Sequence, residues 1–365
     1  MQHLLHQVEP EKIEATIRSL ASFHTRNTLS SGYQEAVAWM ETKFQSIQGL
    51  TVERRRTPLP AGKRIMEATE SVQLLATLPG QDDLPALLIG AHLDSLNLKD
   101  QDENPSAPGA NDNGSGISVM LECARLLATL PERRRTIYFA AFTAEEQGLL
   151  GAKHLSAVLH AEGIRLQAVL TSDMVGNTFC QEGRRDSSRV RCFSADGPSR
   201  ELARWVAWMA DHAIPGFLVD LILRHDRFGR GGDHTPFQQI GYPAIRFTEA
   251  VEEYRRQHTA DDRPDFVDCH YVAGTARVNL LALESLCQAG HPPRDPRIEL
   301  DQSHSTTINW EPTEGLVRIY WRETSSARWQ GSTVGVGGHA VIQGVNKDDH
   351  IFGIGPEGAP PVELG

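Results

Sequence analysis

The sequence lacks several features that would place it in other classes of protein. Its five cysteines show no Cys-x-x-Cys spacing, which argues against a cysteine-ligated zinc site. No apolar run is long enough to span a bilayer, and residues 1–9 lack the basic start and apolar core of a signal peptide. Acidic residues outnumber basic ones by 47 to 36, so we expect no nucleic-acid partner.

The cysteines leave the cellular compartment open. Cys180 and Cys192 flank a polar segment and could form a disulfide in an oxidising compartment. Alternatively, all five cysteines are buried or free thiols. We expect a secreted or periplasmic protein whose signal peptide has been removed, and a cytoplasmic location is the alternative.

Apolar spacing in the first 290 residues predicts helices alternating with strands. The 365 residues suggest one large and one smaller domain, and 40% hydrophobic residues suffice for a full core. Helical spacing covers residues 9–26, 33–47, 115–130, 149–159, 199–213 and 267–289. Strand-like runs cover residues 50–53, 71–77, 86–91, 136–142, 166–170 and 244–247. This order predicts an α/β fold with a mixed, mostly parallel sheet flanked by helices.

The pattern changes near a proline-rich stretch at residues 291–296. Beyond it, residues 306–310, 315–323 and 340–345 alternate apolar and polar positions between turn residues, which predicts a small β-sandwich. We therefore predict a catalytic domain at 1–290, a linker at 291–296 and a β-domain at 297–365. Within the tail, residues 309–310, 317–322 and 348–353 resemble parts of a fibronectin type III-like sandwich, a domain without chemistry of its own.

Imidazole and carboxylate side chains follow several of the predicted strands. The candidate metal ligands are His92, Asp112, Glu146, Asp173 and His258, with Glu145 beside them. His92, the two glutamates and Asp173 each come just after a strand. They should therefore meet at the carboxyl edge of the sheet, where open α/β sheets bind ligands.

This set has the composition of a two-zinc hydrolytic site. Such a site needs a bridging carboxylate, two further ligands for each metal and a base that is not a ligand. We predict Asp112 as the bridge, because the small residues around it let the backbone approach a metal closely. Glu145 is predicted to take the proton from water and return it to the leaving amine. Asp94 could hold the His92 ring through its second nitrogen.

Each of these residues has an ordinary explanation when taken alone. A histidine in a chain with 15 of them is usually structural, and an Asp-Asn-Gly loop is usually a turn. Two adjacent glutamates are favoured at a helix N-terminus by the helix dipole. It is the combination of all of them, in this order along the chain, that favours a metal site.

Five segments between about residues 10 and 290 together resemble the co-catalytic zinc aminopeptidases of the bacterial leucyl aminopeptidase type, metallopeptidase family twenty-eight. They are residues 90–95 (Gly-Ala-His-Leu-Asp-Ser), 109–116 (Gly-Ala-Asn-Asp-Asn-Gly-Ser-Gly), 142–151 (Phe-Thr-Ala-Glu-Glu-Gln-Gly-Leu-Leu-Gly), 172–176 (Ser-Asp-Met-Val-Gly) and 232–237 (Gly-Asp-His-Thr-Pro-Phe). The resemblance implies a zinc exopeptidase fold, two Zn²⁺ ions and a peptide substrate with a free amino terminus.

The resemblance also implies how the ligands are shared between the two metals. His92 and Asp173 would complete one metal, and Glu146 and His258 the other. Asp233 is a candidate through the resemblance alone, as a carboxylate behind the ligands or beside the substrate; an N-cap of the following helix is the alternative. The sequence shows no protease-associated insertion, so we expect a compact form of the domain.

Three further residues are candidates for substrate binding. Met174 follows Asp173 and could line an apolar pocket suited to Leu-like residues, or simply pack in the core. Arg227 and Arg230 precede Asp233 and could bind a substrate carboxylate in bidentate fashion, or pair with surface acids.

The leading interpretation is an exopeptidase that removes N-terminal residues. One alternative on the same fold is a glutaminyl cyclase, which uses a single zinc and an intramolecular amine attack. A second is a carboxypeptidase or dipeptidase that acts through the arginines, and a third is a catalytically inactive binding protein. The oligomeric state is left open.

Overall fold

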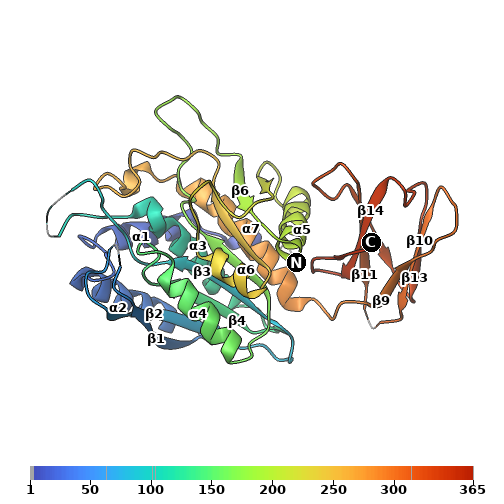
Figure 1. Ribbon diagram of the computed structural model, residues 1–365, viewed down its shortest axis with the longest axis horizontal. Helices are drawn as coiled ribbons and strands as arrows, with labels where there is room; N and C mark the ends of the chain where they lie inside the picture. Colours follow the sequence, from blue (N-terminus) through green and yellow to red (C-terminus); the bar gives the residue numbers. More distant parts are fainter. Residues whose placement is uncertain (1–3, 63, 101, 103, 314, 365) are drawn as a thin grey trace.

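An eight-stranded mixed sheet forms the centre of the larger part of the molecule (Figure 1). The computed structural model describes residues 4–62, 64–100, 102, 104–313 and 315–364. The strand order is β1-β2-β4-β3-β5-β8-β6-β7. The strands are β1 Thr51–Leu59, β2 Thr69–Leu78, β3 Ala86–His92, β4 Ile137–Phe142, β5 Leu166–Ser172, β6 Arg189–Phe193, β7 Leu218–Ile222 and β8 Ala244–Glu249.

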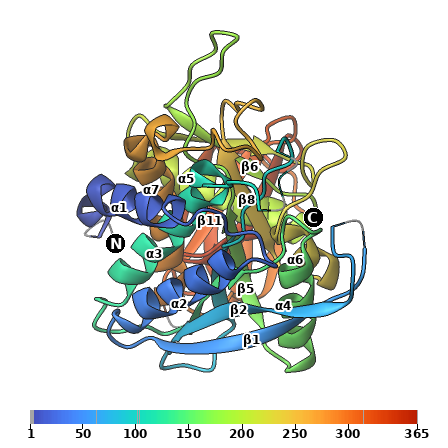
Figure 2. The same ribbon diagram turned by 90° about the vertical axis from the view of Figure 1, so that its left-hand side faces the viewer.

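Helices cover both faces of this sheet, because its central strands are apolar on both sides. Along β3, Leu87, Ile89 and Ala91 join the core on one face, whereas Leu88 joins the core on the other. On the first face lie α1 Pro10–Ala21, α2 Ser31–Gln45, α3 Gly116–Leu127, α5 Gly197–Ala213 and α7 Cys269–Gln288. On the second lie α4 Leu150–Ala161 and α6 His234–Ile240 (Figure 2). Short helical turns occur at Leu5–Gln7, Ala110–Ser115 and Pro264–Phe266.

The predicted α/β fold is confirmed, and the central strands run parallel. Strands β4, β3, β5 and β8 are neighbours in parallel register, so their carboxyl ends share one edge. Strands β6 and β7 and helix α6 were not predicted. In β6, charged residues alternate with buried apolar ones, a pattern of half-exposed strands that could have predicted it. Helix α6 has only seven residues, too few for a clear helical period.

The C-terminal part forms two antiparallel sheets around a separate core. One sheet has the order β13-β10-β9 and the other β12-β11-β14-β15. Ile308, Ile319 and Phe352 are among the residues that fill the space between the sheets. The strands are β9 Arg294–Ile298, β10 Thr306–Glu311, β11 Val317–Glu323, β12 Gly331–Gly335, β13 His339–Ile342, β14 His350–Pro356 and β15 Val362–Leu364. Because β9 begins at Arg294, it includes the end of the stretch predicted as a linker.

This smaller part packs against the larger one beside α5 (Figure 1). Tyr320 and Trp329 belong to the main hydrophobic core, and the Tyr320 ring meets Trp208 edge-on with centroids 5.8 Å apart. Arg328 donates hydrogen bonds to the carbonyl of Val219 in β7 at 2.9 Å. The interface is thus both apolar and hydrogen-bonded.

A glutamate whose side chain is only 12% exposed lies at the same interface. Glu201 of α5 pairs with Arg204, and Glu363 of the C-terminal strand lies 3.9 Å from that arginine. One oxygen of Glu201 is buried without a hydrogen-bond partner among the residues that are described. Burial, together with repulsion from Glu363, raises the pKa of Glu201 to about 7.

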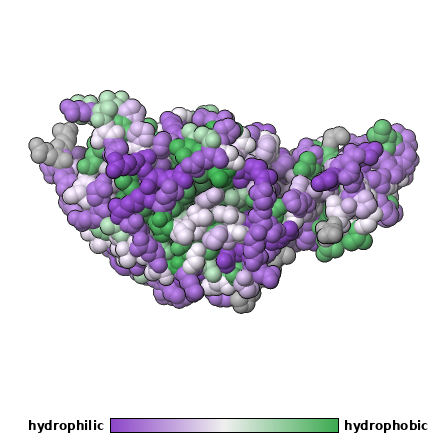
Figure 3. Space-filling view, turned by 90° about the horizontal axis from the view of Figure 1, so that it is seen from below, coloured by the Kyte–Doolittle hydropathy of each residue, from purple (hydrophilic) through white to green (hydrophobic). Residues whose placement is uncertain are grey.

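The structure shows the state of the cysteines and the character of the surface. All five cysteines are free thiols, so the Cys180–Cys192 disulfide is not formed. Within the described ranges, no helix is long and apolar enough to cross a membrane. On the face shown in Figure 3, hydrophilic residues predominate and hydrophobic ones appear in smaller patches between them.

Candidate metal centre

The five predicted ligands converge at the carboxyl edge of the sheet. His92 ends β3, Glu146 follows β4 and Asp173 follows β5, whereas Asp112 precedes α3 and His258 lies in the loop between β8 and α7. His92 Nε2 lies 3.3 Å from Asp112 Oδ1 and 3.5 Å from Asp173 Oδ1. His258 Nε2 lies 3.2 Å from Asp112 Oδ2 and 3.1 Å from Glu146 Oε2. Asp112 therefore belongs to two groups of candidate ligands, one with His92 and Asp173 and the other with Glu146 and His258, and it presents one oxygen to each.

The donor atoms of these groups fit metal ions. In each group the candidate ligand atoms lie within 4.8 Å of one another. His92 Nε2, Glu146 Oε1 and Asp173 Oδ1 are buried and have no hydrogen-bond partner among the described residues. A buried polar atom without a partner is costly. Imidazole nitrogens and carboxylate oxygens are the donors that zinc accepts, so two ions sharing Asp112 would satisfy these atoms.

Charges within the centre shift the pKa values of its members. Burial alone would raise the pKa of Asp112, but the His258 and His92 imidazoles outweigh it and hold that pKa well below its usual range. Burial and the Asp112 charge raise the pKa of Glu146 to about 7. The resulting concentration of negative charge favours a cation.

Glu145 lies beside both groups but belongs to neither. It lines an open cleft of about 540 Å³ together with Asp112, Glu146 and Asp173. Burial, followed by repulsion from Glu146 and Asp173, raises the pKa of its carboxyl well above the usual range, although His92 opposes this. A carboxyl beside the candidate ligands, but not among them, is positioned for proton transfer.

Asp94 supports this region in a different way from the one predicted. The Nδ1 atom of His92 lies 3.1 Å from the backbone carbonyl of Asp94 and 3.7 Å from its carboxylate. The carboxylate turns to Glu145 and Glu146 and accepts their backbone N–H groups, each at 3.2 Å. Asp94 therefore contacts the His92 ring mainly through its main chain, and its side chain orients the two glutamates.

The loop that carries Asp112 is held by a carboxylate that was not predicted. The two oxygens of Asp262 accept the backbone N–H groups of Asn111 and Asp112 at 2.8 and 2.9 Å. Gly116 lets the same loop pack against β5, because a Cβ atom there would lie 2.1 Å from the carbonyl oxygen of Ser172. Burial, with the Asp112 charge, raises the pKa of Asp262 to about 6.

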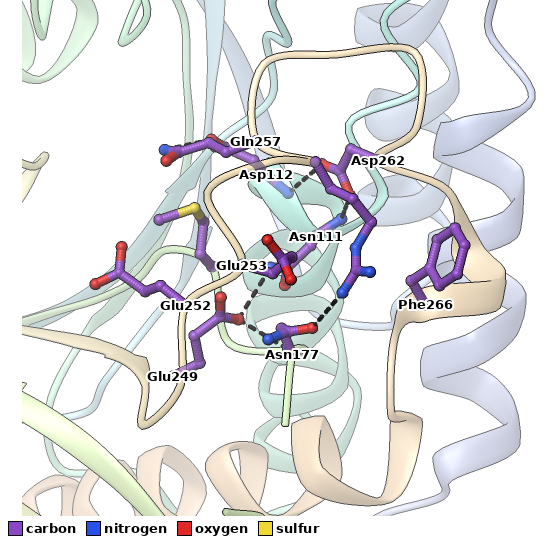
Figure 4. A pocket seen from close by; sticks show the side chains of 11 residues that line it. Asn111, Asp112, Asn177, Glu249, Glu252, Glu253, Gln257, Asp262 and Phe266 are labelled. Carbon is purple, nitrogen blue, oxygen red and sulfur yellow. Dashed lines mark hydrogen bonds between the residues drawn. The ribbon is translucent and has the colours of Figure 1, made fainter. Parts of the chain in front are cut away.

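A second carboxylate, Glu249, ties the neighbouring loops together (Figure 4). Its Oε2 atom accepts the side-chain amide of Asn111 at 2.9 Å and the backbone N–H of Asn177 at 2.8 Å. Arg256 donates to the Asn177 side chain at 2.8 Å. The segments that carry Asp112, Asp173 and His258 are thus connected beneath the candidate ligands.

Asp173 is held by a buried arginine that was also missed. Arg246, in the middle of β8, lies 2.9 Å from Asp173 Oδ2 and 2.5 Å from Asp226 Oδ2. Its side chain is fully buried. An arginine inside the otherwise apolar run of residues 244–247 was the signal that could have found it, since buried charges are rare unless they are paired.

Three residues at this edge of the sheet have an unusual backbone conformation. Ala144, Met174 and His258 have positive φ angles of 52°, 53° and 55° although none is glycine. Each of the three is either a candidate ligand or directly precedes or follows a residue of the centre. Backbone strain of this kind is typical of functional sites.

The other predicted residues also lie near the centre. Arg227 and Arg230 line the open cleft, whereas Met174 borders Asp112 in a separate cavity of about 20 Å³. Asp233 is buried, and one of its oxygens has no partner among the described residues. Asp233 occupies the N-cap position of α6, but its side chain makes no capping hydrogen bond. Burial raises the pKa of Asp233 to about 8, with a contribution from Asp173.

A parallel sheet with a carboxylate and histidine centre at its carboxyl edge is the architecture of a metal-dependent hydrolase. The profile of Peptidase family M28 matches residues 73–283, more than half of the chain. A probable zinc metalloprotease of Leptosphaeria maculans is 32% identical, over 97% of this chain and 93% of that protein. The chain therefore belongs to peptidase family M28, which confirms the resemblance drawn from its motifs.

Solved structures share the fold. The LapA aminopeptidase of Legionella pneumophila matches with a TM-score of 0.62 at 23% identity, covering 78% of this chain and 73% of LapA. A glutaminyl cyclase of Porphyromonas gingivalis matches with a TM-score of 0.61 at 18% identity, covering 76% of this chain and 98% of the cyclase. At these identities the likeness establishes the fold alone. The fibronectin-like character of the tail stays a prediction.

Proposed function

We propose that the protein is a zinc-dependent aminopeptidase that uses two metal ions. The observation that carries the proposal is the pair of ligand groups sharing Asp112, with Glu145 beside them. In this proposal His92 and Asp173 hold one ion, and Glu146 and His258 hold the other. The names of the relatives support zinc, and the LapA likeness supports aminopeptidase activity.

The roles of the residues follow from their positions. Zinc, when bound, supplies Lewis acidity that polarises a carbonyl group and makes water more acidic. Glu145 takes a proton from water and returns it to the leaving amine, because its carboxyl faces the cleft and is not needed as a ligand. The Asp94 carboxylate accepts the backbone N–H of Glu145 and so keeps Glu145 in place, and Arg246 orients Asp173. Asp233 is buried close to His92 and Asp173, and its raised pKa of about 8 keeps its carboxyl mostly protonated at neutral pH.

A glutaminyl cyclase remains the second candidate, because the cyclase fold matches about as well as the aminopeptidase fold. The two functions differ in metal number and in the reaction catalysed. Shared use of Asp112 by two ligand groups favours two ions and hydrolysis.

The deciding experiment combines metal analysis with three substrates on one purified sample. We expect two zinc ions per chain, cleavage of leucyl-p-nitroanilide and no cleavage of its N-acetylated form. Equal cleavage of the blocked and free substrates would refute the aminopeptidase. One zinc with cyclisation of an amino-terminal glutamine, and no hydrolysis, would favour the cyclase.

A further inference from the structure

Four basic side chains surround the cleft that contains the candidate metal centre. They are Arg64, Lys153, Arg227 and Arg230. Arg64 comes from the loop between β1 and β2, Lys153 from α4, and the other two from the loop between β7 and α6. Such a cluster is unexpected in a chain with a net charge of −11.

Two of these cations are already engaged within the protein. Arg227 pairs with Asp226 at 2.8 Å and with Glu252 at 2.5 Å, and Arg64 donates to the backbone carbonyl of Glu146. Arg227 was predicted to bind substrate, but its guanidinium is occupied by these carboxylates. We therefore assign Arg227 a positioning role for the loop that carries Arg230.

The other two cations are available to a ligand. Arg230 donates one long hydrogen bond of 3.4 Å to Glu252, and 31% of its side chain is exposed. Lys153 is exposed and forms no ion pair with any residue that the structure describes. Both side chains border the same cleft as Glu145, so they can reach a molecule bound next to the metal centre.

The metal centre does not neutralise these two charges. Under the proposed function, the carboxylates of Asp112, Glu145, Glu146 and Asp173 are balanced by two divalent ions. Arg230 and Lys153 then leave the cleft with excess positive charge, which attracts anions. Arginine binds carboxylates in a planar bidentate geometry, and lysine acts as a compact point charge.

We propose that the cleft selects peptides with a carboxylate close to the scissile bond, and that Arg230 and Lys153 bind this carboxylate. The group is either an acidic side chain or the free C-terminus of a short peptide, because both present the same chemistry. The inference rests on the proposed function, since it names the substrate class of the same site.

Two substrate pairs separate the sources of the carboxylate. Leucyl-glycine and leucyl-glycinamide differ only at the C-terminus, whereas aspartyl-leucinamide and asparaginyl-leucinamide differ only at the side chain. We expect kcat/KM to favour the carboxylate member of at least one pair by about tenfold or more, the size of one charge-assisted hydrogen bond. The double variant Arg230→Gln, Lys153→Gln should bring this ratio close to one, chiefly by lowering kcat/KM for the carboxylate member.

A matched control and a binding measurement complete the test. Arg165→Gln removes a surface arginine paired with Asp83 before β5, and should keep the wild-type ratio. In the Glu145→Gln variant, calorimetry should show the same preference in Kd without turnover. Hydrolysis with equal kcat/KM and equal Kd within both pairs would overturn this inference and leave the aminopeptidase intact. Failure to hydrolyse any peptide would refute the proposed function, and the Kd ratio would still decide the inference.

Discussion

Replacement of Asp262 by asparagine tests how the candidate metal centre is held together. Asp262 does not reach a metal position itself; its two oxygens accept the N–H groups of Asn111 and Asp112. Asparagine has nearly the same shape but only one acceptor oxygen. Its NH₂ group would face a backbone N–H, so one hydrogen bond is lost and the Asp112 loop must shift.

The expected loss of zinc affinity follows from these contacts. Loss of a partner that orients a metal ligand typically weakens metal binding about 10- to 100-fold. Burial, and to a lesser degree the Asp112 charge, raises the pKa of Asp262, so neutralisation offsets part of the cost to stability. We therefore expect Asp262→Asn to weaken zinc binding by about 10- to 100-fold, with a smaller effect on folding.

Competition with a zinc chelator measures the affinity, and kcat/KM and thermal unfolding are recorded on the same samples. Asp261→Asn is the matched control, because the Asp261 side chain is 72% exposed and lies 3.9 Å from Arg263. Wild-type zinc affinity and activity in a folded Asp262→Asn variant would refute the positioning role.

Three other substitutions have distinct expected results. Glu145→Gln should lower kcat by about 10²- to 10⁴-fold while metal analysis still finds two zinc ions, because the base is lost and the ligands remain; retained turnover would exclude Glu145 as the base. Asp112→Asn should lose metal at both positions, and wild-type metal content would contradict the shared ligand. Glu201→Gln should gain stability relative to wild type as pH rises. The folded state holds the Glu201 proton up to about pH 7, whereas the unfolded chain releases it at the usual lower pKa, so wild-type stability falls across this window. In urea unfolding, the difference in unfolding free energy between Glu201→Gln and wild type should change by about 1–3 kcal/mol from pH 5 to pH 8. The same difference at both pH values would refute the raised pKa of Glu201.

The sequence allowed the fold to be predicted where apolar periodicity was strong. Strand β3, which ends at His92, and strand β5, which ends just before Asp173, are buried along most of their length, so their position and the shared edge were predictable. The candidate ligands could be selected from the sequence because zinc chemistry restricts residue type and because each lies in a recognisable segment. Asp262 was not, since its partner Asp112 lies 150 residues away and an acidic residue in a loop is usually solvated. Only the fold determines which carboxylate turns towards a distant backbone.

The buried charges link the metal centre to the basic residues of the cleft. From the candidate ligand Asp173, oppositely charged side chains follow one another through the protein: Arg246, Asp226, Arg227, Glu252 and finally Arg230. Arg246, Asp226 and Glu252 are almost fully buried, so their interactions are weakly screened by salt. The chain of ion pairs ends at Arg230, whose 3.4 Å contact with Glu252 is the longest of the series. Under the proposal that Arg230 binds a substrate carboxylate, we expect the cleft to distinguish peptides by the position of that carboxylate, and hence by their length or by the residue that carries it.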